Sequence, residues 1–451
     1  MAEIAERFLN YMQDFTPLFT SYRKDVSEKA RQYLSGLVQA GAKKNMERMV
    51  EYVPESDHQA IHQFISNSRW QAQTVMDKVA VNADTSIGDC RNACLLLDES
   101  GFAKKGKMSV GVARQWLGNL GKVDNGQVGV FSVLCNQSDA TLINARLFLP
   151  EKWANDKARC LKAGVPLEHI KHKGKEELAL DLILDARRLK MRYGWIGADA
   201  GYGKGLEFPI AVDALGETFV IDIHKDQPIY TSRIDPYIPE YSGHGREPTK
   251  YKVDQEPIRV DKWVSQQPKG KWRKVKIRES TKGYLTYEVL TSRIWLWQKG
   301  GSKAYCWYLI VRRNPKTHGD YKYSLSNAPE KTSKKKLAYM QGQRFWIERV
   351  FEDGKSQCGM ADYQMRNWTG WHHHISLVMM AMLFMLTERI RSKEDYPLLS
   401  CADIEYLLAR FLPRRDKTLE DVIALMEKRH KQRQAAIDSA YRHRREFHGQ
   451  L

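Results

Sequence analysis

The chain has 451 residues, 42% of them hydrophobic, which is enough for a large buried core divided over two or three domains. Its 72 Lys and Arg against 54 Asp and Glu give a net charge of +18; this surplus indicates a polyanionic partner, because each phosphate contact releases counterions, although a merely basic protein is the alternative. No apolar stretch reaches the roughly 20 residues of a membrane span, and the opening residues lack a secretory signal, so we expect a cytoplasmic protein.

Residues 1–84 are predicted to be helical. Phe8, Met12, Phe15 and Phe19 recur at the spacing of one helix face, and basic residues lie between such positions. A small helical DNA-binding domain fits this pattern. A helical bundle that only packs against its neighbour fits it too, since no recognition helix stands out.

Residues 85–225 change to an alternation of strands and helices. The continuous apolar run at 93–97 is typical of a strand buried on both faces, and a helix is predicted at 175–190. Because a crossover helix joins parallel strands, this order predicts a mixed α/β domain. Further strands are predicted at 127–135, 141–149, 193–198 and 218–223.

Residues 226–332 interrupt this pattern with a predicted β-rich insertion. They alternate polar and apolar residues and are rich in Tyr and Trp, which indicates half-exposed antiparallel strands at 284–297 and 305–312. The insertion also carries a basic cluster that includes Lys271, Arg273 and Lys274.

Helices return after the insertion. Residues 333–392 form the predicted second part of the α/β domain, with a long helix from about Leu337 and an apolar core helix at 372–390. A basic helical region, 393–451, is predicted to follow.

Two aspartates directly follow predicted buried strands, Asp98 after 93–97 and Asp199 after 193–198. A carboxylate at the carboxyl end of a central parallel strand lies where open α/β sheets bind ligands, and its burial is costly unless a cation neutralises it. Mg²⁺ prefers such oxygen ligands, and two ions can stabilise both oxygens of a phosphoryl displacement. Taken singly, an aspartate after a strand is more often a turn or a helix cap.

A third carboxylate, Glu348, lies on the helix predicted after Leu337. Arg344 precedes it by one turn and Lys355 follows it by two turns, so the three side chains share a face. A metal-binding Glu348 between two phosphate-binding cations suits this arrangement. An amphipathic helix with ordinary ion pairs is the alternative.

Three weaker motifs complete the candidates. Lys104 and Lys105, just past Asp98, are predicted phosphate contacts, with solvated lysines as the alternative. The histidine triplet at 372–374 cannot converge on one metal, because consecutive helical residues point about 100° apart; a helix start or a DNA-facing position is preferred. The glycines at 201–205 lack the spacing of a dinucleotide-binding loop.

Three segments together resemble the DDE transposases of bacterial insertion sequences. They are Leu-Leu-Leu-Asp98-Glu-Ser-Gly-Phe, Gly-Ala-Asp199-Ala-Gly-Tyr-Gly and Arg344-x-x-x-Glu348-x(6)-Lys355, and they match the family's three acidic motifs in order. The last resembles the R-E-K part of the Y-R-E-K signature of insertion-sequence families 4 and 701. Residues 111–130 resemble family 701 in particular, and the likeness spans most of 8–390.

The resemblance implies an RNase H-like catalytic domain, interrupted by the insertion and flanked by helical N- and C-terminal regions. It implies that Asp98, Asp199 and Glu348 hold two Mg²⁺ ions, for which Mn²⁺ substitutes. The implied partners are double-stranded DNA, as terminal inverted repeats and target, and a second copy of the chain in a synaptic homodimer. Such a protein is associated with the nucleoid when it is bound to DNA.

The inserted region of such transposases can stack an aromatic side chain on a flipped base. Trp295 and Trp297, on one face of a predicted strand, are the candidates, with core packing as the alternative. One position departs from the signature, because Gln341 stands where its Tyr is expected. The nearest tyrosine, Tyr339, is not assigned to the site.

Two other functions stay open at this point. One is a transposase-derived protein that binds DNA without cutting it, against which the three intact acids argue. The other is a nuclease without strand transfer, against which the insertion and the basic terminal regions argue, since two ends and a target must be held together. Fold likeness alone does not separate these functions.

Overall fold

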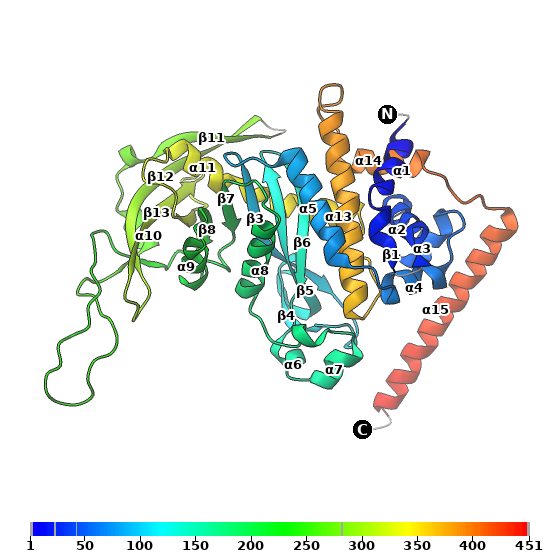
Figure 1. Cartoon of the computed structure of the whole chain (residues 1–451), viewed down its shortest axis with the longest axis horizontal. Coiled ribbons are helices and arrows are strands. Elements are labelled where there is room, and N and C mark those ends of the chain that lie inside the picture. Colours follow the sequence, from blue (N-terminus) through cyan, green and yellow to red (C-terminus); the bar gives the residue numbers. More distant parts are fainter. Residues whose placement is uncertain (1–2, 22–23, 42, 281–282, 449–451) are drawn as a thin grey trace.

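The computed structural model describes residues 3–21, 24–41, 43–280 and 283–448, and Figure 1 shows their arrangement. One large sheet runs from β11 (Arg273–Ser280) at one end of the molecule to the strands in its middle, and the N-terminal helices and α15 (Leu419–His448) lie toward the other end. The remaining positions of the predicted N-terminal domain, insertion and C-terminal region lie outside the described residues.

The core of the sheet has five strands in the order β6-β5-β3-β7-β8. β3, β5 and β6 pair antiparallel, whereas β7 and β8 run parallel to β3. This is the strand order of an RNase H-like fold, so the predicted mixed α/β class is confirmed. The five strands are β3 (Ala93–Ala103), β5 (Lys122–Asn136), β6 (Asp139–Leu147), β7 (Trp195–Ala198) and β8 (Phe219–Ile223), and β4 (Ala113–Leu117) also pairs with β5.

Four strands of the β-rich insertion continue this sheet, whereas two short ones pair with each other in a separate sheet. The last strand of the insertion pairs antiparallel with β8, where Ser324 lies opposite Asp222. The sheet thereby reaches ten strands. The inserted strands are β11 (Arg273–Ser280), β12 (Gly283–Trp297), β13 (Ala304–Arg313) and β14 (Lys322–Ser326); β9 (Pro228–Ile229), β10 (Ile258–Arg259) and α10 (Val260–Ser265) precede them.

Two layers of helices position the site. α8 (Lys175–Arg188) and α9 (Glu207–Ala214) connect the strands of the core. The long helix expected from Leu337 is in fact two helices, α11 (Lys334–Gln343) and α12 (Phe345–Gln357), with Arg344 at the break. Just before the break, Gly342 lies so close to β11 that a Cβ atom there would come within 2.3 Å of Ile277.

The N-terminal helices pack directly on the α/β domain through α13 (Trp368–Arg391), which is buried along most of its length, as its apolar sequence predicts. His373 lies 3.0 Å from the carbonyl oxygen of Ile65 and 2.9 Å from that of Trp70. Burial lowers its pKa to about 4. The N-terminal helices are α1 (Ile4–Gln13), α2 (Ser27–Gln39), α3 (Met46–Tyr52), α4 (His58–Asn67) and α5 (Ala72–Ile87).

The predicted DNA-facing position of the histidine triplet is therefore wrong for two of its members. His373 and His374 are buried at this junction, and Nδ1 of His374 lies 2.8 Å from the Tyr33 hydroxyl. A neutral imidazole has one N–H, so His373 can donate to one of its two neighbouring carbonyl oxygens, while Nδ1 of His374 pairs with the Tyr33 hydroxyl.

The C-terminal region continues from α13 into α14 (Cys401–Phe411) and α15 (Leu419–His448). α15 is exposed along most of its described length and touches the N-terminal helices through Arg429 and Glu51, 2.6 Å apart. Across the described ranges, no helix combines the length and apolar character needed to cross a membrane.

Candidate active site

Backbone register places three aspartates side by side. Leu97 lies opposite Ala198, and Ala198 lies opposite Ile221, on neighbouring parallel strands. The next residue on each strand is Asp98, Asp199 or Asp222. Because adjacent strands lie about 4.8 Å apart and in-register residues share a face, the three carboxylates form one row across the sheet.

Asp98 lies within its strand and does not end it, contrary to the sequence prediction. β3 continues to Ala103 because the long β5 keeps pairing with it, with Asp98 opposite Phe131. Pairing with β7 stops at Ala198. Beyond Leu97 the strand is thus paired on one side only, and Asp98 lies at this opening in the sheet.

The loop after β7 fixes Asp199 and packs against β8. Oδ1 of Asp199 accepts a hydrogen bond from the backbone N–H of Gly201 at 2.9 Å. A Cβ atom at Gly203 would lie 2.0 Å from the carbonyl oxygen of Asp222, so only glycine permits this close approach. The glycine-rich segment is therefore a packing loop behind the carboxylates.

Arg344, at the break between α11 and α12, joins the row of aspartates to Glu348. Its Nη1 lies 3.2 Å from Oδ2 of Asp98, its Nε 3.2 Å from Oδ2 of Asp222, and its Nη2 2.7 Å from Oε1 of Glu348. Each nitrogen of the guanidinium thus has a carboxylate of its own. The structure thus brings the predicted Asp98 and Glu348 to the same arginine. Asp199 follows β7, which lies between β3 and β8, the two strands whose aspartates Arg344 contacts.

Asp222 was not among the residues predicted from the sequence. It is a lone charge in the apolar strand 219–223, and that contrast is the signal that could have indicated it, since a buried charge needs a partner. Ser324 donates to its Oδ1 at 2.5 Å.

Electrostatics set Asp98 apart. Burial raises its pKa to about 7, and the charge of Asp199 adds to the rise while Arg344 opposes it. Burial also acts to lower the pKa of Arg344, but the carboxylates, Asp222 first, outweigh it and raise the value. A carboxyl group in this position is neutral or charged near pH 7 according to how much positive charge stands beside it.

Glu348 differs from the strand aspartates in its exposure. Its side chain is 54% exposed, against 13% for Asp98. Across the described residues, no three His, Cys, Asp or Glu side chains are grouped closely enough to form a metal site. The donor chemistry nevertheless fits a hard divalent cation, because Asp98, Asp199 and Glu348 offer only carboxylate oxygens and the buried Asp98 lacks full charge compensation.

The cations predicted to contact phosphate near these acids have different environments. Lys355 is half-buried, with its Nζ 5.9 Å from the ring centre of Phe102; burial lowers its pKa and Asp98 opposes this. The Nζ of Lys104 lies 3.4 Å above the ring of Tyr363, and burial lowers its pKa to about 8. Lys105 is exposed. Lys355 therefore lies within the electrostatic reach of Asp98, whereas Lys104 is engaged by an aromatic ring.

The predicted DNA contacts of the insertion lie further from the row. Thr291 is the β12 residue in line with Asp222, through Ile310 and Ser324. Trp295 and Trp297 lie further along β12, toward its hairpin with β13, and are half-exposed. The register therefore does not place either tryptophan beside the carboxylates. Lys271, Arg273 and Lys274 are exposed at the outer edge of the sheet, the two last on β11 itself.

Gln341, at the signature position, and the nearby Tyr339 both form hydrogen bonds within the protein. Gln341 is buried and its Nε2 donates to Ser324 Oγ at 2.8 Å, directly behind Asp222. The Tyr339 hydroxyl donates to the carbonyl of Asn92 at 3.3 Å, before the start of β3 and thus away from Asp98. Leaving Tyr339 out of the site agrees with this position.

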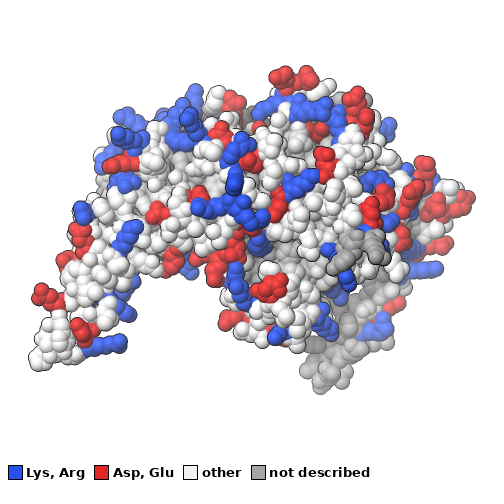
Figure 2. Space-filling model, in the orientation of Figure 1, with Lys and Arg blue, Asp and Glu red and all other residues white. Residues whose placement is uncertain are grey.

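The face of the molecule in Figure 2 carries both signs of charge. Figure 2 shows Lys and Arg gathered over the part of the sheet where Figure 1 places β11 and β12. Below it, a notch separates the long loop between β9 and β10 from the lobe of α6 (Glu151–Ala154) and α7 (Lys157–Lys162), and Asp and Glu side chains lie along its upper rim.

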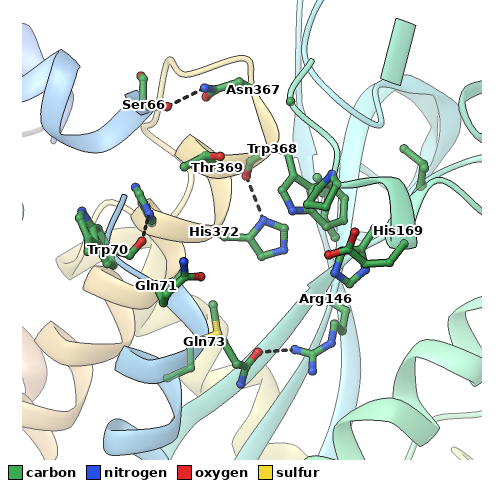
Figure 3. A pocket seen from close by; sticks show the side chains of 18 of the residues that line it. Ser66, Trp70, Gln71, Gln73, Arg146, His169, Asn367, Trp368, Thr369 and His372 are labelled. Atoms are coloured by element: carbon green, nitrogen blue, oxygen red, sulfur yellow. Dashed lines mark hydrogen bonds between the residues drawn. The ribbon is translucent and has the colours of Figure 1, made fainter. Parts of the chain in front are cut away.

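A cavity of about 1120 Å³ lies elsewhere, between the N-terminal helices, the end of β6 and the start of α13 (Figure 3). Arg146 points into it from β6 and is held by Gln73 at 3.0 Å, and Nδ1 of His372 lies 2.9 Å from the carbonyl oxygen of Trp368. Within the described part of the chain, the cavity lining includes no residue of the carboxylate row and no predicted site residue.

Comparison with known proteins agrees with this geometry. The family model described as DDE superfamily endonuclease matches residues 10–284. That match covers more than half of the chain, which therefore belongs to the DDE superfamily endonucleases, as its motifs predicted. A curated relative named "Probable transposase for insertion sequence element IS701", from Microchaete diplosiphon, is 22% identical over 364 residues, or 79% of this chain and 81% of that protein. The family match includes Asp98 and Asp199 and ends before Glu348.

Proposed function

We propose that the protein is a DNA transposase that cleaves at the ends of its insertion sequence and joins the 3′-hydroxyl ends to target DNA. The observation that carries the proposal is the row of Asp98 and Asp199 on adjacent parallel strands, joined to Glu348 through Arg344. A member of the DDE endonuclease family that is similar to an insertion-sequence transposase fits this reaction.

In the proposed reaction Asp98, Asp199 and Glu348 hold two Mg²⁺ ions, for which Mn²⁺ substitutes. When bound, such ions stabilise the attacking and leaving oxygens of an in-line phosphoryl displacement. The residues of the chain position the DNA. Arg344 and Lys355 lie on the same helix face as Glu348 and meet the phosphate next to the scissile bond, because both already interact with Asp98.

The remaining predicted contacts extend the proposed DNA path. Lys104 and Lys105 follow Asp98, and the exposed basic edge of the insertion neutralises phosphates further away. Trp295 and Trp297 are half-exposed and are proposed to stack on a base. The basic edge of the insertion consists of Lys271, Arg273 and Lys274.

The proposed organisation assigns one task to each region. The helices of 1–84 bind DNA, 85–225 and 333–392 form the catalytic domain, 226–332 is the insertion and 393–451 is a basic helical region. A homodimer holds the terminal inverted repeats and the target DNA in the synaptic complex, in the bacterial cytoplasm at the nucleoid.

Cleavage of a labelled duplex that carries the cognate element end tests this proposal. Wild type is compared in Mg²⁺ with Asp98→Ala, Asp199→Ala and Glu348→Ala. Glu352→Ala is the matched control, because Glu352 lies on the same helix and, among the residues that the structure describes, pairs only with Arg349 at the surface. We expect wild type and the control to cut and join, and the three variants to bind without cutting.

Each other outcome points to a different function. If wild type binds the duplex and never cuts it, the protein is a transposase-derived DNA-binding protein. Cutting without joining defines a nuclease. If any of the three substitutions leaves the cleavage rate unchanged, the assignment of that carboxylate is wrong.

A further inference from the structure

The guanidinium of Arg344 has a third partner that the proposed reaction does not use. Asp98 and Glu348 are proposed metal ligands, whereas Asp222 is not; its Oδ1 accepts from Ser324 at 2.5 Å and its Oδ2 lies 3.2 Å from Nε of Arg344. Asp222 thereby links Arg344 to Ser324 on β14.

A buried hydrogen-bond chain holds Asp222 from behind. Gln341 donates to Ser324 at 2.8 Å, and Ser324 donates in turn to Asp222. Ser324 is fully buried and Gln341 nearly so. Since Ser324 and Asp222 are also opposite each other in the β14–β8 pair, both the backbone and the side chains fix this carboxylate.

The position of Asp222 determines what happens when a divalent cation binds. A cation that binds Asp98 and Glu348 competes with the guanidinium that now pairs with both. The displaced charge stays close to the cation and repels it unless another carboxylate compensates it. Asp222 is that carboxylate, because it holds Nε of the same side chain from the far strand of the row.

We propose that Asp222 is a positioning residue that retains Arg344 when the metal binds, and that Ser324 and Gln341 hold Asp222 for this task. The inference rests on the proposed function, because it concerns the same carboxylates. It assigns a role to a residue of β8 that none of the three acidic motifs contains.

The test is a double-substitution cycle read by Mn²⁺ binding to the full-length protein without DNA, followed by electron paramagnetic resonance. We expect Asp222→Asn to weaken Mn²⁺ binding by about ten-fold, the scale on which one neighbouring charge changes an ionic equilibrium. In an Arg344→Gln background the same substitution has no further effect, because no guanidinium has to be displaced. Ser324→Ala weakens binding in the same direction by a smaller factor.

Asp185→Asn is the matched control. Asp185 is likewise a mostly buried carboxylate held by an arginine, Arg146, and by the amide of Asn144 at 3.0 Å, and it lies on α8 away from the row. We expect this variant to bind Mn²⁺ like wild type.

Two results overturn the inference. If Asp222→Asn weakens Mn²⁺ binding equally in the Arg344→Gln background, Asp222 acts on the metal directly. If neither Asp222→Asn nor Ser324→Ala changes Mn²⁺ binding, Asp222 has a structural role only.

The failure of the proposed function gives a different pattern. If wild type binds no Mn²⁺, the two-metal proposal is wrong. Urea unfolding of wild type, Asp222→Asn, Arg344→Gln and the double variant then tests whether Asp222 and Arg344 are energetically coupled. Additive effects of Asp222→Asn and Arg344→Gln on the free energy of unfolding exclude the coupling on which the inference depends.

Discussion

The site holds its acids in two different ways. Asp98 and Asp199 lie on adjacent parallel strands, where backbone hydrogen bonds fix their spacing. Glu348 lies on α12, is 54% exposed and is held to the row by one arginine. The difference teaches that the site has a rigid half, set by strand register, and an adjustable half, set by side-chain ion pairs.

The comparison predicts that the rigid half tolerates no change. We expect Asp98→Glu to reduce end cleavage at least about a thousand-fold, because a ligand that moves by one methylene cannot be corrected by the strand. DNA binding should stay within a factor of two, as measured by titration of the same duplex. Substantial cleavage by Asp98→Glu would show that register does not limit this position.

The adjustable half should tolerate a similar change better. We expect Glu348→Asp to lose about a hundred-fold or less in cleavage rate, because rotation of an exposed side chain and of Arg344 recovers part of the geometry. Single-turnover cleavage measures the loss. Equal losses of cleavage rate in Asp98→Glu and Glu348→Asp would contradict the division into a rigid and an adjustable half.

Burial of Asp98 also predicts a dependence of stability on pH in the metal-free protein. Since its pKa is raised from 3.8 to about 7, the folded state holds a proton that the unfolded state has lost, and stability falls as the pH rises between these values. Asp98→Asn removes this loss, so its stability relative to wild type should grow by about 4 kcal/mol over that range and then level off. Urea unfolding in EDTA at several pH values measures the difference; a constant difference would mean that Asp98 ionises freely.

The smallest effect is expected at the outer edge of the insertion. Replacing Lys271, Arg273 and Lys274 by Ala removes three exposed cations. If each meets a phosphate, the slope of log K against log salt should become less negative by about 3. The cleavage rate at saturating DNA should not change. An unaltered salt slope would show that the DNA path does not include β11.

The sequence predicts the parts of this molecule that depend on local pattern. The apolar runs before Asp98 and Asp199 locate both strands, and the spacing of Arg344, Glu348 and Lys355 locates their shared helix face. These signals are contained in a few consecutive residues, so no knowledge of the fold is needed to detect them.

Features that depend on pairing between distant segments were not predicted. Asp222 joins the row only because β8 lies beside β7 in a particular register, and register is a property of two strands together. The break at Arg344 and the burial of His373 depend in the same way on the neighbouring elements against which they pack.

The pairing of β14 with β8 has a practical consequence for any attempt to shorten the protein. Removing 226–332 as if it were an independent module would expose the hydrogen-bonding edge of β8, a short strand that is apolar apart from Asp222. Such an edge is a template for aggregation. A minimal version of the chain therefore has to keep at least β14, or cap β8 with a charged or proline-containing substitute, to remain monodisperse.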